Sequence, residues 1–296
     1  MQKLYIHIGL PKTATSSIQN FLFSNTSFLN KHGYQYMNTG LNTDLQCHHD
    51  LIWSLGLHQG PSYVPDEIQK NKDRILKQLA DENKQHSDKH LIISSELLTF
   101  LDDFKKLEPI LTIFEDRDIR FIVNLRRQDT FLESLYQQVV KDGVGDTFQT
   151  WYSKAKSIAD YNRLINSLLQ ITHQQNITIG IFNSAIPEFN PTKDFLSAIN
   201  LHDPTIMVKN NLLNERLPAN YTKIIRFSNR FNLNINYALL QFFSKYKDRF
   251  QLFNKQKGYL NHQQRAAIKH EYSASNKALT EQIALPNHIK QEILSW

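Results

Sequence analysis

The sequence predicts an α/β protein with a central, mostly parallel sheet flanked by helices and a helical C-terminal part. Three observations predict this fold. Short apolar runs alternate with amphipathic helical patterns over 1–200, strand patterns stop after residue 200, and no Pro/Gly/Ser-rich linker divides the chain. We therefore expect a single domain over 1–296, in which 1–200 form the α/β core and 201–296 a basic, helical cap.

The expected elements follow in order along the chain. Apolar runs predict strands over 4–9, 34–37, 91–94, 121–125 and 177–182. Apolar residues at helical spacing predict helices over 66–85, 101–114, 130–140, 158–172 and 192–199. After residue 200 the same spacing predicts helices over 221–231, 237–246 and 263–283. Strands that alternate with helices pair in parallel through right-handed crossovers, and ligands bind beyond their carboxyl ends.

Composition narrows the class of protein. The first strand begins directly after residue 3, which leaves no room for a signal peptide. No apolar run reaches the roughly 18 residues that a membrane helix needs. Cys47 is the single cysteine, so an internal disulfide is impossible and a reducing compartment fits. We expect a cytoplasmic protein without an integral membrane segment, and the sequence leaves its oligomeric state open.

Positive charge is concentrated late in the chain. The segment 207–270 holds twelve Lys and Arg against two acidic residues, whereas the whole chain has a net charge of +6. Such a segment attracts an anion, which could be the phosphates of a nucleotide, an acidic polysaccharide or a nucleic acid. Aromatic residues are interleaved with these charges, but no recognised nucleic-acid module accompanies them, so we expect no nucleic-acid partner.

The most informative segment connects the first strand to the first helix. The strand 4–9 runs into the loop 10–17, which reads L-P-K-T-A-T-S-S, and helical spacing begins at once. Such a loop points backbone N–H groups and a helix N-terminus at one place, which binds a phosphate or sulfate. Lys12 adds a full positive charge there. An ordinary strand–turn–helix with a capping Thr13 or Ser16 is the simpler interpretation.

The loop does not fit the Walker A pattern, G-x-x-x-x-G-K-[ST]. Counted from Gly9, the second glycine position holds Ala14 and the lysine position holds Thr15. Lys12 comes too early in the loop. An ATPase or kinase would therefore lack the lysine that reaches the β- and γ-phosphates.

A second motif lies about a hundred residues later. The expected strand 121–125 is followed by Arg126 and then by a helix that carries Ser134 eight residues after the arginine. A guanidinium binds a phosphate with two parallel hydrogen bonds, and a hydroxyl donates to a further oxygen. Because both motifs follow strands of one parallel sheet, we expect them to share a nucleotide site.

Together the two motifs resemble the sulfotransferases that use 3′-phosphoadenylyl sulfate (PAPS), in particular bacterial members similar to carbohydrate sulfotransferases. The strings P-K-T-A-T-S-S and L-R-R-Q-D-T-F-L-E-S-L-Y-Q-Q carry the resemblance. It is strongest over 4–22 and 120–140 and weakest over 200–260. Ala14 replaces the glycine usual in the family, which matters if that position needs a positive φ.

The resemblance implies roles for named residues. The loop would hold the 5′-phosphosulfate of PAPS, Lys12 would contact the bridging oxygen, and no metal would be required. The 3′-phosphate would lie against Arg126 and Ser134, with Lys257 in a late K-G pair beside it. The implied cofactor-binding set is Lys12, Thr13, Ala14, Thr15, Ser16, Ser17, Arg126, Ser134 and Lys257.

Sulfuryl transfer also needs a base for the acceptor hydroxyl. Glu96 directly follows the expected strand 91–94, where several carbohydrate sulfotransferases place a functional glutamate. His49 is the other candidate, because histidine titrates near neutral pH. We assign acceptor contacts to Glu96 and His48. Cys47, His48 and His49 have no second ligand pair at metal spacing, so we expect no zinc site.

The function expected from this sequence is therefore transfer of a sulfuryl group from PAPS to a hydroxyl, with 3′,5′-adenosine bisphosphate as the product. By analogy with the family, the acceptor is a sugar of a surface polysaccharide or glycolipid, and the basic segment 207–270 allows it to be anionic. Two alternatives stay open. One is a P-loop-type small-molecule kinase, and the other is a non-catalytic protein that binds a nucleotide or polyanion.

Overall fold

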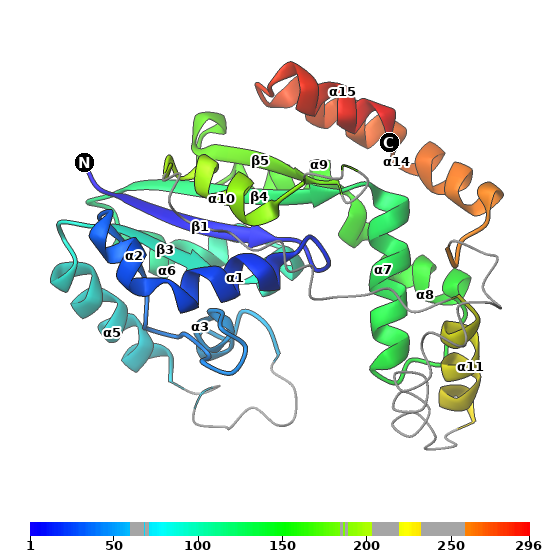
Figure 1. Ribbon diagram of the computed structural model, residues 1–296, viewed down its shortest axis with the longest axis horizontal. Coiled ribbons are helices and arrows are strands. Elements are labelled where there is room, and N and C mark those ends of the chain that lie inside the picture. Colours follow the sequence, from blue (N-terminus) through cyan, green and yellow to red (C-terminus); the bar gives the residue numbers. More distant parts are fainter. Residues whose placement is uncertain (60–67, 69–70, 184–185, 187–188, 203–218, 232–257) are drawn as a thin grey trace.

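The computed structural model is an α/β fold with a five-stranded, all-parallel sheet, as the sequence predicts (Figure 1). It describes residues 1–59, 68, 71–183, 186, 189–202, 219–231 and 258–296. The strands are β1 (Lys3–Gly9), β2 (Tyr34–Tyr36), β3 (His90–Ser94), β4 (Asp118–Arg126) and β5 (Ile177–Phe182). Each coincides with one of the five predicted strands.

Helices connect the strands and form the C-terminal part. Those of the first 200 residues are α1 (Thr15–Ser24), α2 (Thr26–Lys31), α3 (His49–Ser54), α5 (Lys72–Gln85), α6 (Glu108–Ile113), α7 (Gln128–Lys141), α8 (Phe148–Ala155), α9 (Tyr161–Leu168) and α10 (Pro191–Ala198). Later in the chain come α11 (Ala219–Arg230), α14 (His262–Gln282) and α15 (Asn287–Ser295). Short 3₁₀ turns are η1 (Glu96–Phe100), η2 (Phe104–Leu107), η3 (Lys156–Ala159) and η4 (Gln174–Asn176). In the described part of the chain, no helix is both long and apolar enough to cross a membrane.

Strand order places β1 at the centre of the sheet. The order is β2-β3-β1-β4-β5, so β1 pairs with β3 on one side and with β4 on the other. After β1 the chain crosses one face of the sheet through α1 and α2, whereas after β4 it crosses the opposite face through α7. Neighbouring strands whose connections leave to opposite faces open a crevice at their carboxyl ends.

Side chains along each strand point alternately to the two faces of the sheet, and they build two hydrophobic cores, one on each face. On one face, Tyr5, Ile92 and Ile122 pack against the buried side chains of α1, α2 and α10. On the other, Ile6, Ile93 and other strand residues join the larger cluster that includes the apolar faces of α5, α7, α9, α14 and α15. Side chains of successive strand residues point to opposite faces, and burial on both faces explains why these strands are continuously apolar.

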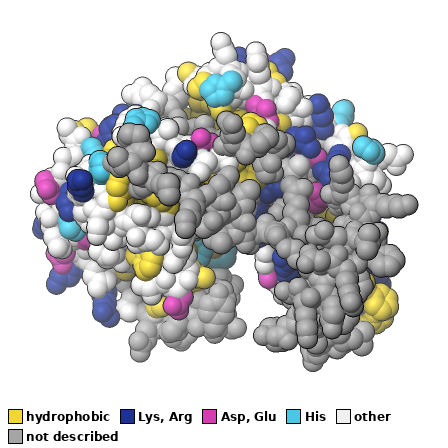
Figure 2. All heavy atoms as spheres, in the orientation of Figure 1, with side chains coloured by type: hydrophobic (Ala, Val, Ile, Leu, Met, Phe, Trp, Pro, Cys, Tyr) yellow, Lys and Arg dark blue, Asp and Glu magenta, His cyan; other side chains and the backbone are white. Residues whose placement is uncertain are grey.

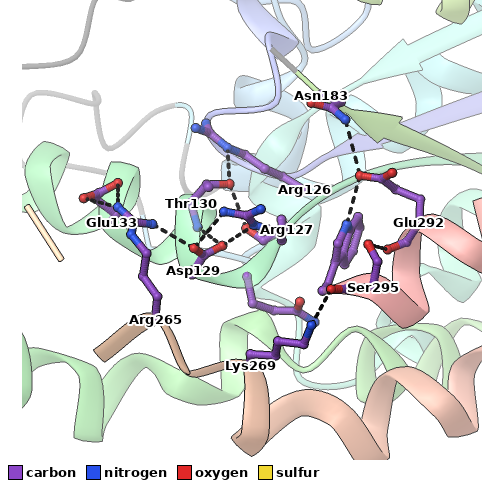
Figure 3. A network of polar contacts seen from close by, with 12 residues as sticks. Arg126, Arg127, Asp129, Thr130, Glu133, Asn183, Arg265, Lys269, Glu292 and Ser295 are labelled. Atoms are coloured by element: carbon purple, nitrogen blue, oxygen red, sulfur yellow. Dashed lines mark hydrogen bonds and ion pairs between the residues drawn. The ribbon is translucent and has the colours of Figure 1, made fainter. Parts of the chain in front are cut away.

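Ion pairs fasten α14 to the first half of α7 (Figure 3). Arg265 donates to Asp129 at 2.7 Å and to both oxygens of Glu133 at 2.9 Å. Glu133 also accepts the backbone N–H groups of Tyr259 and Leu260, the latter at 2.9 Å. A buried charge is tolerated when it is paired and fully hydrogen-bonded, so this network fixes where the helical C-terminal part meets the core.

Two predicted helices are shorter in the structure. The helix expected over 101–114 is a 3₁₀ turn followed by α6, because Asp103 caps the turn through the N–H of Lys105 at 2.9 Å and Pro109 restarts the helix. The helix expected over 158–172 is α9 alone, since the Asp160 side chain caps it at its start. The helix predicted over 237–246 lies outside the described residues, as does the start of the one over 66–85.

Candidate functional site

A cavity of about 900 Å³ lies at the carboxyl end of β1. The loop after β1 and the first turn of α1 form one wall, α3 and the turn after β3 form another, and the second half of α7 closes it. Six residues predicted for the site line it from three separate segments: the first segment supplies Lys12, Ala14, Thr15 and Ser16, and the other two supply His49 and Glu96. The volume is in the range of small-molecule and cofactor sites.

The loop before α1 has an unusual backbone. Lys12 has a φ of 68° and Ala14 a φ of 63°, both in the left-handed region. Position 14 therefore does require the positive φ that the family's glycine would adopt freely. The hydroxyls of Thr13 and Thr15 both donate to the carbonyl of Leu10, at 2.7 and 3.1 Å. These two threonines thus hold the loop in shape, and Ser16 is the predicted hydroxyl residue that is exposed on the cavity wall.

Lys12 is held at both its side chain and its backbone. Its Nζ donates to Oε1 of Gln138 at 2.8 Å, and Nε2 of Gln138 in turn donates to Asp142 at 2.9 Å. The bond to Asp142 turns the amide oxygen of Gln138 toward Lys12. Burial lowers the pKa of Lys12, and nearby Lys141 lowers it further, while Glu96 acts in the opposite direction. A neutral amide positions the ammonium without cancelling its charge.

Arg126 connects the second motif to the first. Its guanidinium donates to the backbone carbonyl of Lys12 at 2.6 Å and to Thr130 at 3.1 Å, and it lies 5.0 Å from the ring centroid of Phe182. Arg126 is buried, and neither it nor Ser134, half-buried on α7, lines the cavity. The two predicted motifs are therefore in contact, but the contact is between Arg126 and the backbone of the loop, on the side away from the cavity.

The two adjacent histidines have different environments. His48 is fully buried, its Nε2 donates to the Met37 carbonyl at 2.9 Å, and its Nδ1 accepts the Ser94 N–H at 3.1 Å. Both ring nitrogens thus bind backbone, and His48 does not reach the cavity. His49 lines the cavity, and its Nδ1 is 2.9 Å from the Ser95 hydroxyl. Burial lowers the pKa of His49 to about 4, so the imidazole is neutral at pH 7.

Glu96 begins the 3₁₀ turn η1 at the end of β3, and it is partly exposed on the cavity wall. Burial raises the pKa of its carboxyl group, and the positive charge of Lys12 partly opposes that rise. A carboxylate with a raised pKa is a stronger base than an ordinary one, which is the change that proton abstraction requires.

Several lining residues were not predicted from the sequence. They are Pro11, Leu45, Trp53, His58, Gln59, Leu97, Leu135, Gln138 and Asp142. Gln138 lies in the L-Y-Q-Q string. Its spacing of three from Leu135 and four from Asp142 predicts that the three side chains share one face of the helix, and this pattern could have identified Gln138 from the sequence. Trp53 is 3% exposed, and its indole nitrogen is buried without a hydrogen-bond partner among the described residues.

The remaining predictions concern metals and the late basic segment. Within the described ranges, no three His, Cys, Asp or Glu side chains gather as metal ligands would. Cys47 is buried, which raises the pKa of its thiol to about 12. Ser17 directly follows the lining residues Thr15 and Ser16 but does not line the cavity itself. Lys257 lies outside the described residues.

Compared with known proteins, the chain matches no protein-family model and no curated protein. What the site does must therefore be argued from its own chemistry.

Proposed function

We propose that this protein is a sulfotransferase that moves the sulfuryl group of PAPS to a hydroxyl of an acceptor. One observation carries the proposal: a single cavity of about 900 Å³ joins Lys12, the N-terminus of α1, and the two candidate bases Glu96 and His49. A cation and amide donors on one wall with a base on another are what sulfuryl transfer between two oxygens needs. The cytoplasmic location predicted from the sequence belongs to this proposal.

The lining residues suit the sulfated end of PAPS. At the start of α1 the N–H of Ser17 donates to the Ala14 carbonyl at 2.9 Å, whereas the N–H groups of Thr15 and Ser16 stand at the first two helical positions, where phosphate or sulfate oxygens bind. Lys12 adds a positive charge held at 2.8 Å by a neutral amide. The 3′-phosphate would lie near Arg126 and Ser134, on the side of the loop away from the cavity, because neither residue lines the cavity. To contact it, Arg126 would exchange its bond with the Lys12 carbonyl for one with the phosphate.

The proposed transfer is a single in-line displacement. The acceptor oxygen forms a bond to sulfur while the bond between sulfur and the bridging oxygen breaks, and the electron pair stays on the leaving phosphate. The proton of the acceptor hydroxyl passes to Glu96. Lys12 and the amides of α1 stabilise the charge that builds on the leaving oxygen, which a preorganised donor does without reorganising.

Glu96 is the better candidate for the base. Its pKa is raised by burial, whereas burial lowers that of His49 to about 4 and makes its imidazole a weak base. The bond between His49 Nδ1 and Ser95 leaves Nε2 as the ring nitrogen that can contact a ligand. We assign His49 to orienting the acceptor hydroxyl, with its ring centroid 5.5 Å from that of Trp53.

The described walls favour a neutral acceptor with polar and apolar sides. Lys12 is opposed by Glu96 and Asp142, while Leu45, Leu97 and Leu135 supply apolar surface. A sugar hydroxyl of a surface polysaccharide or glycolipid fits this lining, because sugars have polar edges and apolar faces. An anionic group on the acceptor would have to lie away from these two carboxylates.

The test is calorimetric titration with 3′,5′-adenosine bisphosphate in the absence of metal, beside 5′-AMP and Mg·ATP. We expect the bisphosphate to bind more tightly than both. Transfer of labelled sulfate from PAPS to a panel of sugars should then be lost in Lys12→Ala, by roughly 100-fold or more, while bisphosphate binding persists.

Lys141→Ala is the matched control. This variant removes a half-buried cation that lies close to Lys12 but does not line the cavity. The transfer rate of the variant should therefore stay near that of the wild type. Preference for Mg·ATP would replace the proposal with the kinase alternative. Bisphosphate binding without transfer to any acceptor would leave a non-catalytic nucleotide-binding protein.

A further inference from the structure

The outer side of α11 combines features that no part of the proposed reaction uses. Ile224, Phe227 and Phe231 are 45%, 56% and 55% exposed, and the two phenylalanine rings lie 4.7 Å apart. Hydrophobic side chains accordingly reach the surface over α11 (Figure 2). Their spacing of three and seven residues places them on one stripe of the helix.

A basic stripe lies next to the apolar one. Lys223, Arg226 and Arg230 follow one another at helical spacing, and the described segment 219–231 contains no acidic residue. Lys223 and Arg230 are exposed. The opposite side of the helix, with Tyr221 and Ile225, is buried. α11 therefore has one stripe for the core, one apolar stripe and one cationic stripe, which is the pattern of helices that lie in a membrane interface.

α11 is also fixed beside the cavity. The side chain of Asn229 donates to the carbonyls of Val140 and Val144, at 2.7 and 3.0 Å, and so fastens α11 to the end of α7. Gly145 allows a close approach there, because a Cβ at this position would lie 2.8 Å from the Arg230 nitrogen. Asp142, between these contacts, lines the cavity. A surface that the outer face of α11 binds would thus lie near one wall of the site.

We propose that this outer face of α11, formed by Lys223, Ile224, Phe227, Arg230 and Phe231, binds the surface of an anionic lipid bilayer. The cations attract the negative headgroups, and the two phenylalanines and the isoleucine enter the boundary with the acyl chains. Charge complementarity decides for an anionic surface, since a purely apolar partner would leave the cationic stripe without a counter-charge. This binding is independent of the sulfotransferase proposal, although it would bring a membrane-held acceptor to the cavity.

The experiment is co-sedimentation of the full chain with vesicles of phosphatidylcholine alone and with vesicles that also contain phosphatidylglycerol. Wild type should bind only the anionic vesicles, and added salt should weaken the binding. The double variants Phe227→Ser/Phe231→Ser and Lys223→Glu/Arg230→Glu should each lower the partition coefficient roughly tenfold or more.

Leu294→Ser is the matched control, because Leu294 is 47% exposed on α15, and it should bind like the wild type. Calorimetry with 3′,5′-adenosine bisphosphate on the same variants reads the nucleotide site separately, and it should be unchanged. Equal binding to neutral and anionic vesicles, or full binding by both α11 variants, would overturn the proposal. Binding to single-stranded DNA in place of vesicles, lost in the phenylalanine variant, would also overturn it and assign the surface to nucleic acid.

Discussion

The two halves of α7 use their polar residues in opposite ways. In the first half, Asp129 and Glu133 are buried and bind Arg265 of α14. In the second half, Gln138 lines the cavity together with Asp142, the residue that directly follows the helix, and the two hold Lys12 in place through a chain of two hydrogen bonds. One helix thus fastens the C-terminal part at one end and presents a cation to a ligand at the other.

The difference lies in which charges are satisfied within the protein. Glu133 is buried and has a cation and two backbone N–H groups as partners, so its charge is satisfied within the protein. Among the described residues, the ammonium of Lys12 has one neutral partner, and its pKa is lowered, so its charge remains available to an anion. Fully paired groups stabilise the fold, and incompletely paired ones mark a site. The predictions below test that distinction.

The largest expected effect concerns the two candidate bases. Glu96→Gln keeps the shape of the side chain but removes the carboxylate, so the transfer rate should fall roughly 100- to 10,000-fold. His49→Ala should cost less and act mainly on the KM of the acceptor. Steady-state kinetics with a fixed acceptor measures both. A larger loss of rate in His49→Ala would assign the base to the histidine.

Next in size is the cost of breaking the α7–α14 network. Arg265→Ala leaves Glu133, whose side chain is 2% exposed, without its cation. The free energy of unfolding should fall by about 3–5 kcal/mol, as for other broken buried pairs. Denaturant titration measures this fall. Lys277→Ala, which breaks an exposed pair with Glu281, is the control and should cost less than about 1 kcal/mol.

Buried histidines should make stability depend on pH. Burial lowers the pKa of His48 to about 4 and that of His7 to about 3, both from an ordinary value of 6.5. Below pH 6.5 the unfolded chain therefore binds protons that the folded one does not, and the free energy of unfolding falls as the pH drops. The loss for His48 alone should be roughly 3 kcal/mol between pH 7 and pH 4.

Chemical unfolding at several pH values checks this dependence. His48→Asn should flatten the curve over that range, whatever its effect on stability at pH 7. A variant curve parallel to that of the wild type would show that His48 does not contribute.

A smaller effect should follow from releasing Lys12 on the cavity side. Gln138→Leu removes the acceptor that holds the ammonium, and the transfer rate should fall about tenfold while nucleotide binding changes little. Asp142→Asn is the control, because an asparagine oxygen can still accept from Gln138. Equal losses in both variants would argue for the charge of Asp142 instead of the orientation of Gln138.

The smallest effect concerns the strained loop. Ala14 has a φ of 63°, where glycine lacks the penalty of a Cβ, so Ala14→Gly should raise the free energy of unfolding by up to about 1 kcal/mol. Ala274→Gly, in the middle of α14, should lower it by about 1 kcal/mol. Thermal melts of both variants give the comparison. A loss of stability in Ala14→Gly would mean that the loop conformation carries no strain.

The sequence by itself determined the five strands, their parallel arrangement and the loop that holds Lys12. These features depend on apolar runs, helical spacing and turn residues. Each of these patterns is complete within a short stretch of sequence. It did not determine where the helix over 101–114 would break, because Asp103 and Pro109 compete there with an otherwise helical pattern.

Only the tertiary structure decided which polar residues face the cavity. His48 and His49 are neighbours in the chain, yet backbone groups of Met37 and Ser94 bind both nitrogens of one ring and leave the other at the cavity wall. Gln138 reaches Lys12 over a separation of 126 residues. Such contacts depend on how distant elements pack, and no local pattern in the chain records the partner that a polar side chain will meet.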